Sequence, residues 1–199
     1  MVLLVAALCA FTPQLGTGQL LVEISAGARS GTALVHDSIV TAFDVRPSLA
    51  PVLAVALVVP LDSSWTARVG VDFSSGELQR HEADASSVAL GRVSTAAFTV
   101  GLEHALPAGF STWIGVGGIK YFPAEETGLF RLGSASVAGL GTAALAHTLP
   151  VGRRFGCAVE LRYDIHGFTT PALRDEGFTS SQTVHRVALT VRAHGRAGR

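Results

Sequence analysis

A strict alternation of apolar and polar side chains in residues 155–168 is the feature that most constrains the fold of this chain. One alternating set is apolar and comprises Phe155, Cys157, Val159, Leu161, Tyr163 and Ile165. The other set carries charge and comprises Gly156, Ala158, Glu160, Arg162, Asp164 and His166. Because side chains alternate sides along a strand, the segment is predicted to be a strand with one apolar and one charged face. At about 3.3 Å per residue, a tilted strand of about ten residues crosses the hydrocarbon layer of a bilayer.

The rest of the chain contains further segments that are predicted to be strands. These segments are residues 20–29, 51–59, 65–74, 96–103, 110–122, 136–147 and 184–194. Short turns at 60–64, 106–109 and 149–154 alternate with longer predicted loops at 30–46, 75–92, 123–133 and 168–181. Strict alternation of short turns with long loops is typical of bacterial outer-membrane barrels. The predicted fold class is therefore all-β, an eight-stranded antiparallel up-and-down transmembrane β-barrel.

The composition fits a surface that faces lipid and excludes some other functions. Charged residues make up 15% of the chain, against roughly 25% in an ordinary soluble domain. The formal net charge is zero, so no basic face indicates binding to nucleic acid. No internal apolar run reaches the length of about 18 residues that a transmembrane helix needs. Any segment that crosses a membrane is therefore expected to be a strand.

The N-terminus differs from the rest because residues 1–11 are a continuous apolar run without alternation. Small residues suited to a cleavage site follow it, so residues 1–18 are predicted to be a secretory signal peptide. Residues 19–199 are then the predicted barrel domain. After cleavage Cys157 is the only cysteine, which excludes a disulfide framework and a cysteine-based metal site.

Two architectures share this strand pattern, and they differ in which face meets the core. In a soluble lipocalin-like barrel the apolar faces surround a ligand, whereas in a membrane barrel they face lipid. The low charge content and the single lysine, Lys120, favour the membrane barrel. Aromatic residues near strand ends favour it too, since such barrels carry aromatic girdles at both interfaces. The predicted girdle residues are Trp65, Phe73, Phe110, Phe122, Phe155 and Phe168.

In the membrane barrel the charged faces would point into the lumen. The predicted lumen charge network comprises Glu23, Arg29, Arg68, Asp72, Glu103, Glu160, Arg162, Asp164, His166, Arg186 and Arg192. The interior of an eight-stranded barrel is just wide enough for side chains to fill. A buried charge without a partner costs several kcal/mol, so mutual pairing is expected. The hypothesis is a lumen that is filled by ion pairs and has no wide pore.

The chain resembles a known family in three features. These are the hairpin plan, the Leu-Pro turns at Leu106-Pro107 and Leu149-Pro150, and the sequence GVGGIKYF at 115–122. They look like the small eight-stranded outer-membrane barrels related to the OmpA transmembrane domain, OmpW and OmpX. The resemblance implies a bacterial outer-membrane location, contact with outer-membrane lipid and the barrel-insertion machinery, and a monomer without cofactor or metal. The chain departs from the family in ending at Arg199 without a terminal aromatic residue.

Three functions remain open at this point. The first is a structural or adhesive barrel, or one that passes a small solute through a narrow path. The second is the soluble ligand-binding barrel. The third, which the residues favour least, is an enzyme that modifies lipid A with His166, Ser180, Ser181 and His185. These residue types form no recognisable motif, so the protein is expected not to be an enzyme.

Overall fold

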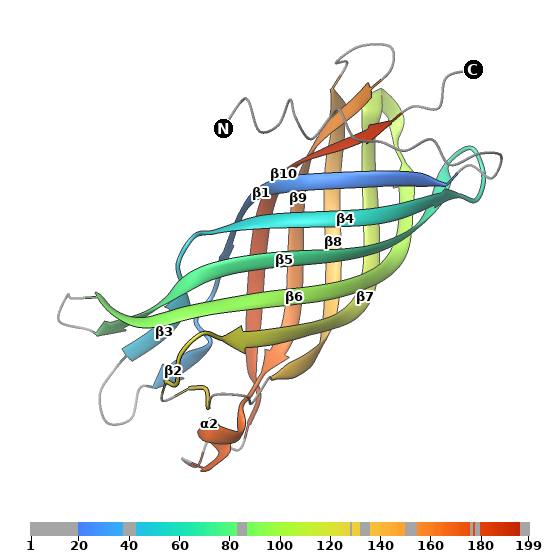
Figure 1. The fold of residues 1–199 in the computed structure, drawn as a ribbon. Coiled ribbons are helices and arrows are strands. Elements are labelled where there is room, and N and C mark those ends of the chain that lie inside the picture. The colour runs from blue at the N-terminus through green and yellow to red at the C-terminus, as the bar shows by residue number, and fades with distance from the viewer. Residues whose placement is uncertain are drawn as a thin grey trace.

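The chain forms a closed barrel of eight antiparallel strands (Figure 1). The computed structural model describes residues 20–37, 43–82, 87–127, 129–131, 136–149, 155–175, 177 and 180–195. The barrel strands are β1 (Leu21–Gly31), β4 (Ala50–Pro60), β5 (Trp65–Glu82), β6 (Ser87–Ala105), β7 (Phe110–Pro123), β8 (Val137–Leu149), β9 (Phe155–Phe168) and β10 (Gln182–Gly195). The predicted fold class is confirmed, while the predicted signal peptide lies outside the described residues.

The barrel is a meander that closes where its first strand meets its last. Strands β4 to β9 each pair with the next strand in the chain, and β1 pairs with both β4 and β10. In the closing pair Ala26 lies opposite Val191. The short turns therefore gather at one end, where β1 also begins and β10 ends, and the longer connections gather at the other, which we call the loop end. The first of these turns is held by Asp62, whose carboxylate accepts hydrogen bonds from the amides of Ser64 and Trp65 at 2.7 and 2.8 Å.

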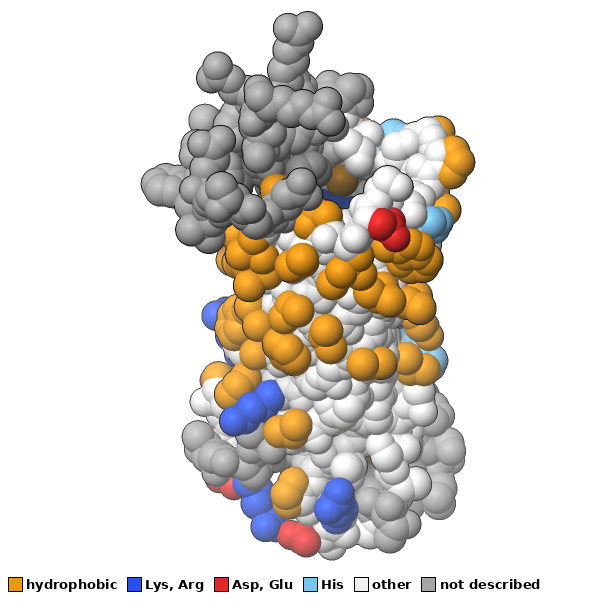
Figure 2. Space-filling model, turned by 90° about the vertical axis from the view of Figure 1, so that its right-hand side faces the viewer, with side chains coloured by type: hydrophobic (Ala, Val, Ile, Leu, Met, Phe, Trp, Pro, Cys, Tyr) orange, Lys and Arg blue, Asp and Glu red, His pale blue; other side chains and the backbone are white. Residues whose placement is uncertain are grey.

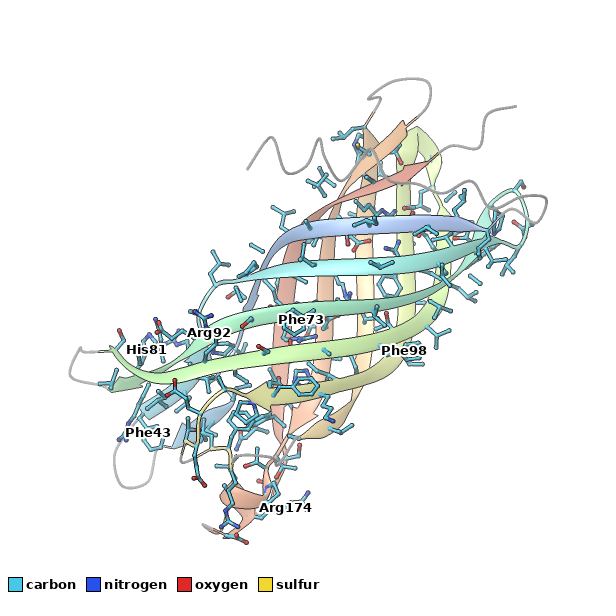
Figure 3. The ribbon with its side chains drawn as sticks, viewed as in Figure 1. Phe43, Phe73, His81, Arg92, Phe98 and Arg174 are labelled. Carbon is cyan, nitrogen blue, oxygen red and sulfur yellow. The ribbon has the colours of Figure 1, made fainter. Side chains whose placement is uncertain are left out.

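Two of the predicted loops contain strands. Short strands β2 (Val35–Asp37) and β3 (Phe43–Pro47) lie in the predicted loop 30–46, and β5 and β6 continue through most of the predicted loop 75–92. The loop prediction was wrong there because these residues lie beyond the apolar band described below. Neither face has to be apolar at that height, and backbone pairing with β3 and β6 sustains the strands. Phe43, His81 and Arg92 mark this extension in Figure 3.

The β5–β6 extension also contains a β-bulge. Leu78 pairs with Gly91 and Gln79 with Ala89, which leaves Leu90 as an extra residue. Gly91 has a φ of 113°, a value that residues with a Cβ rarely adopt. Two other connections contain one short helix each: η1 (Pro107–Gly109) in a predicted turn and α2 (Pro171–Asp175) in a predicted loop.

The outer face of the barrel is apolar, and its charged strand faces point inward. Val71 and Leu161 are 56% and 52% exposed, whereas Arg68 and Glu160 are 6% and 3% exposed. In Figure 2 hydrophobic side chains form a band across the middle of the visible face, with Lys and Arg side chains towards one end. This arrangement is the reverse of a soluble ligand-binding barrel, so that alternative is wrong. A band of this kind fits the hydrocarbon layer of a membrane.

A cluster of buried apolar side chains lies inside the barrel towards the loop end. We call this cluster the loop-end core; it comprises Leu34, Val35, Val45, Leu78, Val93, Ala97, Ile119, Tyr121, Leu129, Phe130, Leu140, Phe168, Leu173 and Val184. Several members come from the connections between strands, so the connections fold over the mouth. Thr170 ties two of them together, because its hydroxyl donates to the carbonyl of Leu129 at 2.6 Å and accepts from the amide of Leu173 at 3.2 Å.

Candidate functional site

The lumen between the short turns and the loop-end core is filled by charged side chains. All eleven residues of the predicted charge network are buried inside the barrel, and ten of them form ion pairs with one another. They project from β1, β5, β6, β9 and β10. Facing strands contribute small inward residues, such as Ala56 on β4 and Ala144 and Ala146 on β8. These small side chains leave room for the long guanidinium groups.

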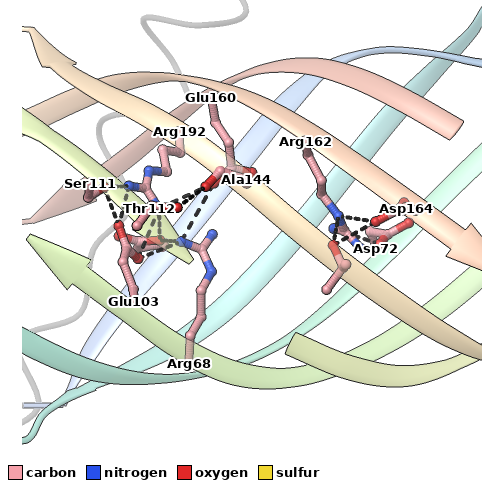
Figure 4. Close-up of polar contacts among 12 residues, drawn as sticks. Arg68, Asp72, Glu103, Ser111, Thr112, Ala144, Glu160, Arg162, Asp164 and Arg192 are labelled. Carbon is pink, nitrogen blue, oxygen red and sulfur yellow. Dashed lines mark hydrogen bonds and ion pairs between the residues drawn. The ribbon is translucent and has the colours of Figure 1, made fainter. Parts of the chain in front are cut away.

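The group nearer the short turns contains three glutamates and two arginines, and we call it the glutamate layer (left in Figure 4). Its members are Glu23, Arg68, Glu103, Glu160 and Arg192. Arg68 contacts Glu23 at 2.8 Å and Glu103 at 3.2 Å. Arg192 binds both carboxylate oxygens of Glu103, at 2.5 and 3.2 Å, and lies 3.3 Å from Glu160. Two arginines thus cross-link strands from opposite parts of the barrel wall.

The group nearer the loop end contains three arginines and two aspartates, and we call it the aspartate layer. Its members are Arg29, Asp72, Arg162, Asp164 and Arg186. Asp164 is its hub: it accepts from Arg162 Nε at 2.7 Å, Arg186 Nη2 at 2.9 Å and the Thr142 hydroxyl at 2.7 Å. Asp72 contacts Arg29 at 2.6 Å and Arg162 at 3.0 Å. One layer thus has an excess negative charge and the other an excess positive charge.

Trp113 lies between the two layers and was not predicted to be a lumen residue. The guanidinium carbons of Arg68 and Arg162 lie 5.4 and 5.5 Å from the centre of its ring, one from each layer. Such cation–π contacts are favourable, most of all away from water. The glycines of β7 obscured which face Trp113 occupies. The positions of Lys120 and Phe122 could have placed Trp113 inward. These two residues lie on the outward face of β7, so the odd-numbered residues of that strand face the lumen.

His166 faces the lumen, as predicted, but bonds to a tyrosine rather than to a carboxylate. Its Nε2 atom lies 2.6 Å from the hydroxyl of Tyr121, which the prediction missed. Tyr121 also packs against Phe130 and Phe168, with ring centroids 6.1 and 5.1 Å away. This pair therefore joins the aspartate layer to the loop-end core.

Four residues of the predicted aromatic girdle lie on the outer face, and one residue lies inside the barrel. Trp65, Phe73, Phe110 and Phe122 are all 40–50% exposed on the outer face. Phe168 is only 1% exposed and packs in the loop-end core, so its assignment to the girdle was wrong. The physical reason is parity, because Phe168 shares the face of His166 on β9. The side chain of Phe155 lies outside the described part of the structure.

The residues considered for a lipid A-modifying enzyme do not come together. His166 points inward, while His185 on the neighbouring strand points outward and bonds to the hydroxyl of Tyr163. The hydroxyl of Ser181 donates to the carbonyl of Phe168 at 3.4 Å. The two histidines therefore lie on opposite sides of the barrel wall.

Solved structures similar to this chain are small outer-membrane barrels. Neisserial surface protein A is 10% identical, with 91% of this chain and 98% of that chain covered at a TM-score of 0.53. The outer membrane protein AlkL, solved in lipid bilayers, is 14% identical, with 94% and 95% covered at a TM-score of 0.50. No family model and no curated protein matches the sequence.

The fold likeness agrees with the two faces of the barrel wall. None of the helices in the described ranges is long and apolar enough to span a bilayer. The outer strand faces carry the apolar band, and the inner faces carry the paired charges. The predicted resemblance is thus confirmed at the level of the fold. This chain has the fold of the small eight-stranded outer-membrane β-barrels.

Proposed function

We propose that this protein is a structural or adhesive barrel of the bacterial outer membrane that does not conduct ions through its lumen. The observation that carries the proposal is the filled interior, where every side chain of the ten paired charges is at most 11% exposed. Beyond them Phe130 and Phe168, 0% and 1% exposed, close the loop end. A conducting path would have to separate both ion-pair layers and the loop-end core.

The ordered loop end supports a role in contact with other surfaces. The longer loops of bacterial outer-membrane barrels lie on the extracellular side. Here β2 pairs with β3, β3 pairs with the extension of β5, and the hydroxyl of Ser136 donates to the carbonyl of Thr169 at 2.7 Å. A preorganised surface loses less conformational entropy when it binds a partner. The loop end is therefore the part of the barrel best suited to adhesion.

We further propose that the barrel functions as a monomer, surrounded by outer-membrane lipid and delivered by the barrel-insertion machinery. Each of the eight barrel strands is paired on both sides, so the described barrel wall offers no unpaired edge to a second copy. The passage of a small solute remains the alternative function. It requires a wet path that the two charged layers would have to line rather than block.

The proposal is tested by recording current across planar bilayers that contain the purified, refolded protein. A wide porin in the same membrane serves as a positive control for detection. We expect no steady large conductance, because the ion pairs and the loop-end core fill the lumen. Steady, large and reproducible channel openings from the pure protein would refute the non-conducting barrel and favour solute passage.

A further inference from the structure

A small cavity lies inside the barrel where the aspartate layer meets the loop-end core. Its volume is about 30 Å³, which is enough for at least one water molecule. The polar residues that line it are Arg29, Ser30, Ser48, Ser74, Thr95, Tyr121 and Arg186. The lining thus contains two guanidinium groups and no carboxylate, which is unusual inside a protein.

Both arginines have donor groups that the described part of the protein does not use. Arg186 donates through Nη2 to Asp164 at 2.9 Å, while its Nε and Nη1 atoms are buried without a hydrogen-bond partner there. Arg29 donates through Nη1 to Asp72 at 2.6 Å, and neither its Nε nor its Nη2 forms a hydrogen bond within that part. Each residue is only 4% exposed. Buried donors of this kind nearly always have a partner, so an acceptor is expected in the cavity.

The charge of the aspartate layer indicates that this acceptor is an anion. Three arginines there face two aspartates, and Asp164 already accepts hydrogen bonds from Arg162, Arg186 and Thr142. His166, beside the layer, bonds to Tyr121 and supplies no negative charge. A water molecule would satisfy the donors, whereas an anion would also offset the positive charges of the two guanidinium groups that border the cavity.

The hydroxyl of Thr95 supplies a further donor. It is buried on the inner face of β6, lines the cavity and has no hydrogen-bond partner among the described residues. The hydroxyl of Thr95 therefore has a hydrogen that it can direct at a ligand. The small size of the cavity suits a small anion.

We propose that this cavity binds a monatomic anion of the halide class, held by the guanidinium groups of Arg29 and Arg186 and by the hydroxyl of Thr95. The anion neutralises the excess positive charge of the aspartate layer. It thereby acts as an integral part of the lumen packing. The inference does not depend on the proposed function, since it concerns how the interior is balanced rather than what the loop end contacts.

The test compares the stability of the refolded barrel in sodium chloride or bromide with that in sodium isethionate at equal ionic strength. A ligand that binds only the folded state raises the unfolding midpoint in urea, and the rise increases with its concentration relative to its Kd. Thr95→Val keeps the side-chain shape and is expected to reduce the halide-dependent rise. Thr190→Val is the matched control, because that hydroxyl is also buried and unpartnered in the described chain but lies outside the cavity lining. It is expected to retain the full rise.

A second measurement does not depend on variants that fold. Crystals of the native protein soaked in bromide are expected to show an anomalous peak between Arg29 and Arg186. The inference is overturned if that position holds only water in bromide. It is also overturned if halide and isethionate give the same midpoints, or if the halide effect is equal in the native protein and both threonine variants.

Discussion

Replacing Asp164 by asparagine tests whether the lumen is stabilised by charge pairing. The carboxylate is 1% exposed and accepts from Arg162, Arg186 and Thr142, with Arg29 Nη2 a further 3.5 Å away. Asparagine has the same shape but turns one acceptor into a donor that would face a guanidinium group. Breaking a buried pair in this way costs about 3–5 kcal/mol, which lowers the folding equilibrium constant roughly a hundred-fold to several-thousand-fold.

The matched control for this prediction is Asp175→Asn, the same change in an exposed ion pair. Asp175 lies 2.6 Å from Arg131, and the two side chains are 59% and 56% exposed. Exposed pairs contribute about 0–1 kcal/mol. The assay is urea unfolding of the barrel in lipid vesicles in halide-free buffer, followed by tryptophan fluorescence and by gel mobility before and after heating. Equal losses for the two variants would show that water screens the lumen charges, and the reasoning would fail.

Further predictions concern the wall and one turn. Leu161→Arg is expected to lower the free energy of unfolding in vesicles by about 2–4 kcal/mol, because it places a charge in the apolar band. The control Leu61→Arg changes a turn residue and is expected to lower it by only about 0–1 kcal/mol. Gly117→Ala is expected to cost about 1–3 kcal/mol in the same assay, because its Cβ would overlap the backbone of β6, whereas Gly139→Ala meets open space. Hydrogen bonds from backbone amides hold the pKa of Asp62 below its usual value. The Asp62 carboxylate is therefore expected to stabilise the turn fully above the ordinary carboxyl pKa, and this stabilisation is lost as the pH falls through the lowered pKa. Hydrogen exchange of the turn amides measures the loss.

Each of these predictions has an outcome that contradicts it. Similar losses for both leucine variants would mean that the band does not face hydrocarbon. A Gly117→Ala variant as stable as Gly139→Ala would mean that β6 and β7 are less closely packed than the structure shows. The Asp62 carboxylate does not hold the turn if the exchange rates of the turn amides stay constant as acid protonates it. The same conclusion follows if these rates are equal in the native protein and in Asp62→Asn.

Much of the fold could be predicted because the strands obey a simple rule within the apolar band. Side chains of β9 alternate with a period of two, and the inward set includes Glu160, Arg162 and Asp164, as expected. The rule lapses beyond the band, where both faces of a strand can be polar. That is why the ends of β5 and β6 and the whole of β2 and β3 carried no periodic signal.

The candidate site was predictable in membership but not in arrangement. The eleven charged or titratable residues were identified by their face, whereas Trp113, Tyr121 and Thr142 were missed because glycine and alanine dilute the pattern of β7 and β8. Phe168 was misplaced because its position near a strand end was given more weight than its parity. The division into a glutamate layer and an aspartate layer had no local signal at all.

The sequence by itself determined which side chains share a face, because alternation along a strand is a property of the extended backbone and needs no partner. Only the tertiary structure decided which charges meet. Glu103 on β6 binds Arg192 on β10 although 89 residues separate them, since closing the barrel sets the register of every strand and therefore the height of each side chain in the lumen. That register follows from the pairing of all eight strands at once, which no single segment of the chain encodes.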